Sequence, residues 1–291
     1  MAQPSGAQIR PLYPMLYEAV VRRALEEDLG RAGDLTTDAI VPPEASANAL
    51  LVARRGGRIA GMDVAACAFR LLDHGVKVTI RVQDGCDAAP GEPLAEIRGA
   101  ARPLLSAERS ALNLLGRLSG IATATRDIAA AIREYPAQVV CTRKTTAGLR
   151  ALEKYAVRAG GGANHRFGLD DAVLIKDNHR LIAGSVTTAV ERVRRYVGHM
   201  VKIEVEVDTI EELEEVLRLG VDAVLLDNMP LADIRRSVEL AQRRVVIEAS
   251  GGINPETARE VAAAGVDLLS VGWLTHSAPQ LDVALDLEPE L

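Results

Sequence analysis

Cysteine is scarce in this chain, and its spacing argues against two kinds of stabilising cross-link. The 291 residues contain three cysteines, Cys67, Cys86 and Cys141. An odd number with no CxxC pair indicates neither a disulfide framework nor a zinc site. We therefore expect a protein of a reducing compartment, the cytoplasm. Hydrophobic residues make up 48% of the chain, which is enough for a substantial core at this length.

The chain also lacks an excess of positive charge and any long apolar run. Its formal net charge is −6 and its sequence pI is about 5.5, so phosphate backbones and acidic lipids would not attract it. No apolar run approaches the roughly 18 residues of a membrane span, and the first ten residues, MAQPSGAQIR, lack the apolar region of a signal peptide. We expect no nucleic-acid partner and no membrane association.

One stretch runs against the overall acidity. Residues 141–179 read CTRKTTAGLRALEKYAVRAGGGANHRFGLDDAVLIKDNH. They gather these basic residues: Arg143, Lys144, Arg150, Lys154, Arg158, His165, Arg166 and Lys176. Several stand at a predicted strand end or among glycines, where α/β proteins place functional residues. This stretch predicts an anion-binding active site.

The first part of the chain predicts a small α/β domain. Residues 12–29 have apolar side chains at helical spacing, and this helical pattern ends at Gly30. Residues 47–101 read as strands punctuated by glycines, with a helix at 63–73, and residues 103–133 read as a long helix. We expect an N-terminal α/β sandwich-like domain over residues 1–118, onto which residues 277–291 could pack.

The remainder, residues 119–276, alternates between short apolar strands and amphipathic helices. The strand-like runs are 138–142, 172–176, 202–207, 223–227, 245–250 and 268–272. Such alternation implies parallel strands joined by right-handed crossovers. The runs are fewer than a complete β/α barrel contains, so an incomplete, open β/α barrel is the preferred fold and an open doubly wound sheet the alternative.

Polar residues stand where each of these strands ends. In chain order they are Arg143 and Lys144; Lys176 and Asp177; Glu206 and Asp208; Asp227 and Asn228; Ser250, Gly251 and Gly252; and Gly272. The carboxyl ends of parallel barrel strands share one mouth. The series therefore predicts that these groups converge in one site.

The last two strand ends predict a phosphate site. Ser250, Gly251 and Gly252 precede the helical pattern at 255–265, so backbone amides and a helix N-terminus could both face an anion. Gly272 ends the neighbouring strand. A simple tight turn is the alternative.

The acidic strand ends suggest a different ligand. Glu206 and Asp227 could hold a divalent cation, and oxygen-only ligation suits Mg²⁺, or they could bind sugar hydroxyls. Glu204 shares a strand face with Glu206 but could merely pair with Lys202 or Lys176. Lys176 could also form a Schiff base with a carbonyl substrate.

Motifs along nearly the whole chain resemble the quinolinate phosphoribosyltransferase family, the decarboxylating nicotinate-nucleotide pyrophosphorylases. They are ALEEDLGRAGDLTT, ERSALNLLGRLSGIAT, TRKTTAGLRALEKYAVRAGGGANHR, LIKDNH, EVEVD, LLDN, EASGGI and VGWLTHSAP. Two positions depart from the family pattern. Cys141 replaces an expected aspartate and Ala147 an expected proline, and neither change removes a charged ligand.

The resemblance implies an Mg²⁺-dependent reaction of quinolinate with phosphoribosyl pyrophosphate (PRPP), giving nicotinate mononucleotide, pyrophosphate and CO₂. It implies that Arg143, His165, Arg166 and Lys176 bind the quinolinate carboxylates, with Arg109 supplied by the second subunit of a homodimer. Lys144 and Lys176 would face the pyrophosphate, and Glu206 and Asp227 the ribose hydroxyls and metal. Ser250, Gly251, Gly252 and Gly272 would bind the 5′-phosphate, whereas His276 could be structural.

Three other functions remain open from the sequence. A sister protein of this fold, associated with molybdenum transport operons, would act on another substrate. A barrel lyase would use Lys176 as a Schiff base. A non-catalytic barrel would bind phosphate or a dicarboxylate without releasing a product.

Overall fold

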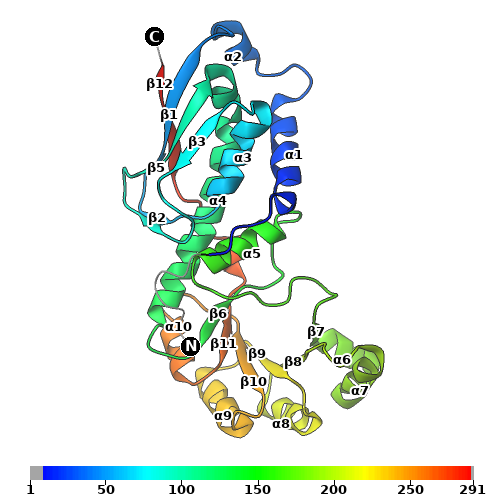
Figure 1. Ribbon diagram of the computed structural model, residues 1–291. Helices are drawn as coiled ribbons and strands as arrows, with labels where there is room; N and C mark the ends of the chain where they lie inside the picture. The colour runs from blue at the N-terminus through cyan, green and yellow to red at the C-terminus, as the bar shows by residue number, and fades with distance from the viewer. Residues whose placement is uncertain (1–8, 290–291) are drawn as a thin grey trace. The chain divides into compact units, whose positions relative to one another are not determined.

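The computed structural model describes residues 9–289, which pack as two compact units (Figure 1). The barrel unit consists of Asp127–Lys144 and Gly162–Trp273. The sheet unit consists of residues 9–126, Thr145–Gly161 and residues 274–289. Both units are therefore built from segments that are distant in the sequence.

The sheet unit is organised around a four-stranded antiparallel sheet in the order β12-β1-β5-β3. Its strands are β1 (Ser46–Ala53), β3 (Lys77–Ile80), β5 (Pro93–Ala100) and β12 (Val283–Pro289), and a separate short pair is formed by β2 (Gly57–Arg58) and β4 (Asp87–Ala88). Strand β12 pairs with β1 from Ala53–Val283 to Ala47–Pro289. The C-terminal segment thus forms an edge strand of this sheet.

Helices complete the sheet unit. They are η1 (Pro14–Leu16), α1 (Glu18–Leu29), α2 (Leu35–Ile40), α3 (Met62–Leu72), α5 (Arg150–Ala159), α11 (Trp273–His276), whose first residue belongs to the barrel unit, and most of α4 (Ala101–Ala131). The predicted helices at 63–73 and 103–133 are confirmed with shifts of at most two residues at their ends, whereas the stretch at 12–29 forms the short η1 and then α1, which begins six residues later than predicted. Asp34 caps α2 by accepting a hydrogen bond from the Thr37 amide at 3.0 Å.

The barrel unit contains a six-stranded parallel sheet in the order β6-β11-β10-β9-β8-β7. Its strands are β6 (Gln138–Val140), β7 (Val173–Ile175), β8 (Ile203–Val207), β9 (Ala223–Asp227), β10 (Val246–Ser250) and β11 (Leu268–Ser270). No described pairing joins β6 to β7. The barrel is therefore open, as the sequence predicts.

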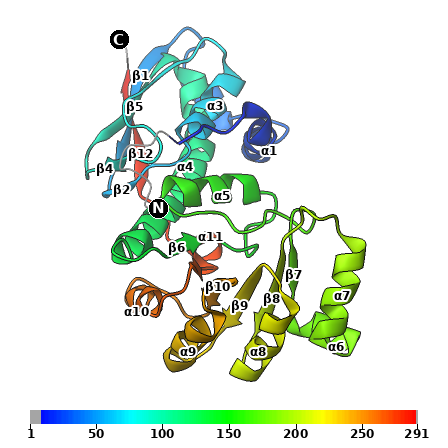
Figure 2. The same cartoon turned by 60° about the horizontal axis from the view of Figure 1, so that its bottom comes forward.

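Helices line the outer side of this sheet (Figure 2). They are α6 (Asp177–Ala183), α7 (Val186–Tyr196), α8 (Ile210–Leu219), α9 (Leu231–Ala241) and α10 (Ala258–Ala263). The expected helix at 255–265 is shorter than predicted. Asn254 Oδ1 accepts hydrogen bonds from the amides of Glu256 and Thr257 at 2.9 and 3.0 Å, so a side-chain-capped turn replaces the first helical turn.

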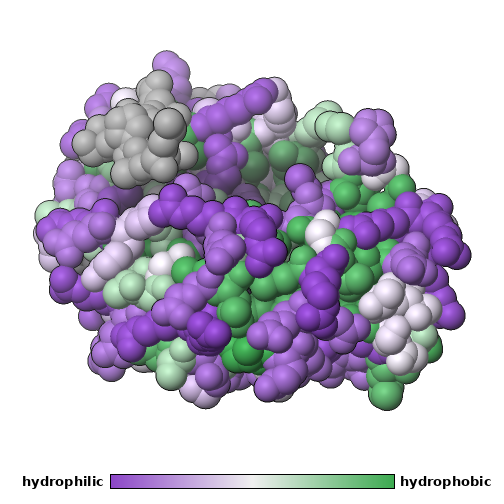
Figure 3. Space-filling model, turned by 90° about the horizontal axis from the view of Figure 1, so that it is seen from below, coloured by the Kyte–Doolittle hydropathy of each residue, from purple (hydrophilic) through white to green (hydrophobic). Residues whose placement is uncertain are grey.

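The surface of the barrel unit has apolar areas framed by polar side chains (Figure 3). Leu181 and Ile182 on α6 are 79% and 84% exposed, and Tyr196 and Met200 are 92% and 81% exposed. Within residues 9–289, no helix is both long enough and apolar enough to cross a bilayer.

Candidate active site

The inward face of the barrel sheet carries the acidic residues. On β8, Val205 and Val207 are fully buried on one face, and Glu204 and Glu206 stand on the other. Residues that are register partners on neighbouring strands lie on the same face of a sheet. The inward face of β8 therefore continues across β9 and β10. Glu206 and Glu248 are both register partners of Leu225, and Asp227 pairs with Ser250. Four carboxylates, Glu204, Glu206, Asp227 and Glu248, therefore share one face of the sheet.

Lys176 and Glu206 form an ion pair at the end of β7. Lys176 Nζ lies 2.6 Å from Glu206 Oε2, and the two side chains are 48% and 10% exposed. The buried carboxylate thus holds a more accessible ammonium group. The Lys176 amide also donates to Nδ1 of His179 at 2.9 Å, which fixes the start of α6.

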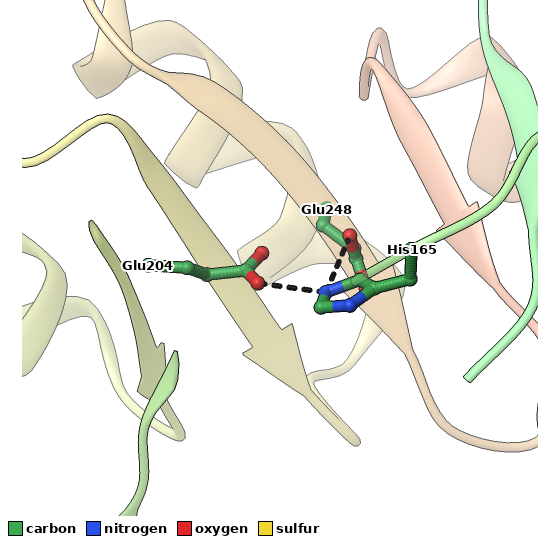
Figure 4. Close-up of side chains that lie close together, drawn as sticks. All are labelled: His165, Glu204 and Glu248. Carbon is green, nitrogen blue, oxygen red and sulfur yellow. Dashed lines mark hydrogen bonds and ion pairs between the residues drawn. The ribbon is translucent and has the colours of Figure 1, made fainter. Parts of the chain in front are cut away.

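His165 joins two acidic strands of the barrel (Figure 4). Its Nε2 atom lies 2.8 Å from Glu204 Oε2 and 3.7 Å from Glu248 Oε2. Its Nδ1 atom accepts a hydrogen bond from the Arg166 amide at 2.8 Å. Burial lowers the pKa of His165, but the hydrogen bond to Glu204 and the charges of Glu248 and Glu204 outweigh it, and the pKa is raised.

Glu204 therefore pairs with His165. It pairs with neither Lys202 nor Lys176, the two lysines that the sequence offered as partners. Lys202 instead pairs with Asp222, and Lys176 pairs with Glu206.

Two arginines carry like charges close to each other. Burial and the Arg143 charge lower the pKa of the Arg166 guanidinium. Arg166 Nη1 donates to the Ala172 carbonyl at 3.1 Å. In the described part of the chain, Nε of Arg143 is buried and has no hydrogen-bond partner. Like charges this close favour the binding of an anion, and of a dianion above all.

The glycine turn after β10 depends on the absence of side chains. Gly251 has φ of +104°, and a Cβ atom there would lie 2.1 Å from Asn228 Oδ1. The Asn228 amide donates to the Ser250 carbonyl at 2.9 Å, so the ends of β9 and β10 are tied together. Beyond the turn, the Trp273 indole donates to the Ile253 carbonyl at 2.9 Å, which ties the loop after β11 to the same place.

This turn leaves fewer helix-end donors than the sequence predicts, because Asn254 already engages the amides of Glu256 and Thr257. The donors that remain for an anion are those of the Ser250–Gly252 turn itself. A cavity of about 200 Å³ lies beside it, lined partly by Ser250, Gly251 and Gly252.

The remaining predicted site residues have diverse surroundings. Lys144 is exposed, and its amide donates to Thr142 Oγ1 at 3.0 Å. Asp227 is partly buried and accepts from Asn228 Nδ2 at 3.0 Å, and Gly272 directly follows the buried Val271. Arg109 on α4 and His276 in α11 are exposed residues of the sheet unit. His276 Nδ1 lies 2.6 Å from Ser277 Oγ.

Sequence reasoning missed Glu248 as a site residue. Its signal was present, because Glu248 lies two positions before Ser250 and so shares its strand face. Asn228 and Trp273 were also missed as organisers of the glycine turn, since their hydrogen bonds depend on tertiary contacts.

Both units match parts of one known family. Residues 34–119 match the N-terminal domain of quinolinate phosphoribosyl transferase, and residues 121–286 match its C-terminal domain. These matches cover most of the chain, which therefore belongs to the quinolinate phosphoribosyl transferase family.

Individual relatives agree with this family. The chain is 45% identical to the probable nicotinate-nucleotide pyrophosphorylase (carboxylating) of Bacillus subtilis, covering 90% of each protein. It is 46% identical to the nicotinate-nucleotide pyrophosphorylase (carboxylating) of Mycobacterium leprae, covering 92% of this chain and 95% of that protein. The crystal structure of NadC from Streptococcus pyogenes superposes with a TM-score of 0.93 at 39% identity, covering 97% of this chain and all of that one.

Proposed function

We propose that the chain transfers the phosphoribosyl group of PRPP to quinolinate, with decarboxylation, in NAD biosynthesis. The products are nicotinate mononucleotide, pyrophosphate and CO₂. One observation of the site supports this most strongly. The partly buried Arg143–Arg166 pair, suited to a dianion, lies in the same unit as an acidic inward face and a glycine turn.

The dicarboxylate is assigned to the cations of the barrel unit. Arg143, Arg166, His165 and Lys176 bind the quinolinate carboxylates, because two ionised carboxylates offset the mutual repulsion of the guanidinium groups. Lys144 and Lys176 face the pyrophosphate of PRPP. A Schiff base at Lys176 is disfavoured, since its Nζ atom is held in an ion pair with Glu206 at 2.6 Å.

Glu206 and Asp227 are assigned to Mg²⁺ and the ribose hydroxyls. Both are oxygen donors on the inward face of adjacent strands, which fits the preference of Mg²⁺ for carboxylate oxygens. When bound, Mg²⁺ would neutralise negative charge on the pyrophosphate. Ser250, Gly251, Gly252 and Gly272 are assigned to the 5′-phosphate. Gly251 and Gly252 have no side chain between an anion and their backbone amides, and nothing lies within 4 Å of a Cβ atom placed on Gly252.

The chain's own residues then act by electrostatics. As pyrophosphate departs, positive charge develops on the ribose carbon, and the carboxylates of Glu206 and Asp227 stabilise it. The lysines take up charge on the leaving group while the arginines hold the quinolinate ring in place. Once its nitrogen is bonded to ribose, the ring is cationic and can hold the electron pair left by CO₂.

We also propose that the enzyme is a cytoplasmic homodimer in which Arg109 acts in the partner's site. The exposed apolar residues Leu181, Ile182, Tyr196 and Met200 support association, because large apolar side chains left open to solvent can be buried at an interface. The thiols of Cys67, Cys86 and Cys141 suit a reducing compartment.

An assay of the purified protein tests the proposed reaction. Quinolinate, PRPP and Mg²⁺ should give nicotinate mononucleotide, whereas nicotinate in place of quinolinate should give none. Omitting Mg²⁺ or adding a chelator should abolish turnover. A folded protein that binds PRPP but converts neither compound would refute the proposal and favour the sister protein with another substrate.

A further inference from the structure

The loop that carries His165 and Arg166 is not held in place by hydrophobic packing. Every residue from 161 to 174 is at least partly exposed. Phe167 and Leu169, the large apolar side chains of the loop, are 50% and 72% exposed. Segments with few buried apolar contacts have little stability of their own. The positions of the two basic side chains must therefore be set by polar contacts.

Asp171 supplies two of these contacts. Its Oδ2 atom accepts a hydrogen bond from the Phe167 amide at 2.6 Å, and its Oδ1 atom accepts one from the Gly168 amide at 2.9 Å. Successive backbone N–H groups form a concavity that binds anions, and here the anion is a carboxylate of the same loop. Asp171 therefore closes residues 167–171 into a turn that needs no buried apolar side chain.

The closed turn fixes the guanidinium group of Arg166. Ala172 directly follows Asp171, and its carbonyl accepts a hydrogen bond from Nη1 of Arg166 at 3.1 Å. Among residues 9–289, this is the one hydrogen bond found for the guanidinium. The edge formed by Nε and Nη2 is thus left for a ligand. A guanidinium binds a carboxylate best through two parallel hydrogen bonds from one such edge.

The charge of Asp171 also acts on the two arginines of the site. Burial and the Arg143 charge lower the pKa of the Arg166 guanidinium, whereas the charges of Glu204 and Asp171 raise it. Burial raises the pKa of Asp171 itself, but the hydrogen bonds from backbone amides and the Arg166 charge outweigh it, and the pKa is lowered. Asp171 is therefore a carboxylate at neutral pH and offsets part of the repulsion between the arginines.

Resting on the proposed function, we propose that Asp171 is a positioning residue for quinolinate, which holds Arg166 in the orientation that binds a substrate carboxylate. Asp171 does not touch the substrate and acts through the loop and the guanidinium group. Its effect should be specific to the dicarboxylate. The glycine turn assigned to the 5′-phosphate of PRPP is held by separate contacts of Asn228 and Trp273.

The substitution Asp171→Asn tests this role, because it keeps the shape, removes the charge and leaves one acceptor oxygen for two amides. Steady-state rates are measured against quinolinate at saturating PRPP, and against PRPP at saturating quinolinate. We expect the KM for quinolinate to rise by about 10- to 100-fold, the size of effect that a small misplacement of a binding group can have. The KM for PRPP should change by less than about threefold, because groups without shared partners usually act independently.

Asp170→Asn is the matched control, because it is the same chemical change at the neighbouring residue. Asp170 is exposed, and its side chain makes no hydrogen bond or ion pair with any residue that the structure describes. This variant should keep both KM values of the wild type. Thermal unfolding curves of the two variants show whether each is folded.

A second variant, Asp171→Glu, shows whether the carboxylate itself is what matters. It keeps the charge and both acceptor oxygens on a side chain that is longer by one methylene group. We expect its KM for quinolinate to lie between those of the wild type and Asp171→Asn, with the KM for PRPP unchanged. A residue that merely filled space would give no such order.

Several outcomes would overturn the proposal. One is an unchanged KM for quinolinate in folded Asp171→Asn. Another is an equal rise of the two KM values, which would indicate a general disturbance of the site. If Asp171→Asn does not fold, Asp171→Glu decides, and an equal rise of its two KM values would refute the role. Absence of any wild-type turnover refutes the proposed function itself and is recognised before a variant is measured.

Discussion

The acidic residues of the barrel interior differ in what neutralises them. Glu206 has Lys176 at 2.6 Å, and Glu204 has His165 at 2.8 Å. Asp227 is only partly buried and accepts from an amide side chain. The oxygens of Glu248 have no hydrogen-bond partner among the described residues, and His165 Nε2 lies 3.7 Å from Oε2. Residues of the same chemical kind on one sheet face thus have different local charges and different partners.

At this scale, the clearest expectation concerns Lys176. Lys176→Met should fold and lose about 100-fold or more in kcat, because removing one charged contact to the transition state typically costs about that much. The measurement is steady-state turnover together with a thermal unfolding curve. Lys202→Met is the matched control: its Nζ pairs with the half-exposed Asp222 away from the inward face, and activity should persist. Full activity of Lys176→Met would remove this lysine from the site.

For single residues, the sequence was sufficient where a position at the end of a strand alone decides whether the residue lies in the site. Lys176, Glu206, Asp227 and Ser250 follow from finding where each strand ends. The partners His165–Glu204 could not be predicted, because the loop that carries His165 crosses to β8 over a separation set by tertiary folding. Glu248 was overlooked for another reason, since a buried acid inside a strand looks like packing until its hydrogen bonds are traced.

In helix α4, a neighbouring backbone segment lies so close that glycine is favoured over alanine, the reverse of their helix propensities. Within the sheet unit, a Cβ atom on Gly120 would lie 2.1 Å from the Pro279 carbonyl oxygen and 3.0 Å from Gln280 Cα. The segment leading to β12 therefore packs directly on the helix backbone. From helix propensity alone, Gly116 and Gly120 would be weak points of this helix.

Gly120→Ala should accordingly destabilise the protein by about 1–3 kcal/mol, the usual cost of overpacking. In an exposed helix interior the same change would stabilise by about 1 kcal/mol. Chemical denaturation measures the difference. Gly198→Ala is the control, because nothing lies within 4 Å of its added Cβ and its φ is not positive. A variant at Gly120 as stable as wild type would mean that the segment at 279–280 can move away at little cost.

The secondary structure was predictable to a large extent, because hydrophobic periodicity and glycine punctuation are local signals. The six barrel strands were located to within two residues at either end. The end of the barrel sequence was less predictable. The side chain of Asn254 accepts hydrogen bonds from the amides of Glu256 and Thr257, just before α10 begins. Hydrophobic periodicity does not reveal this effect.

For the whole molecule, the proposed sharing of Arg109 has a direct test. Arg109→Ala and Lys144→Ala should each be nearly inactive as separate proteins. Mixing them under conditions that allow subunit exchange should restore part of the activity, because some mixed dimers would contain one site with both residues intact. The measurement is turnover before and after exchange. No recovery, with exchange shown by differently tagged subunits, would count against sharing.

The pairing of β12 with β1 also bears on how the protein is made. Val283–Pro289 must find Ser46–Ala53 across most of the chain. A ribosome therefore releases the barrel segments before the sheet unit can close, and until then β1 presents an unpaired edge in the crowded cell. Such an edge invites pairing with other chains. Protein synthesis rate and chaperone supply should thus affect the yield of folded protein.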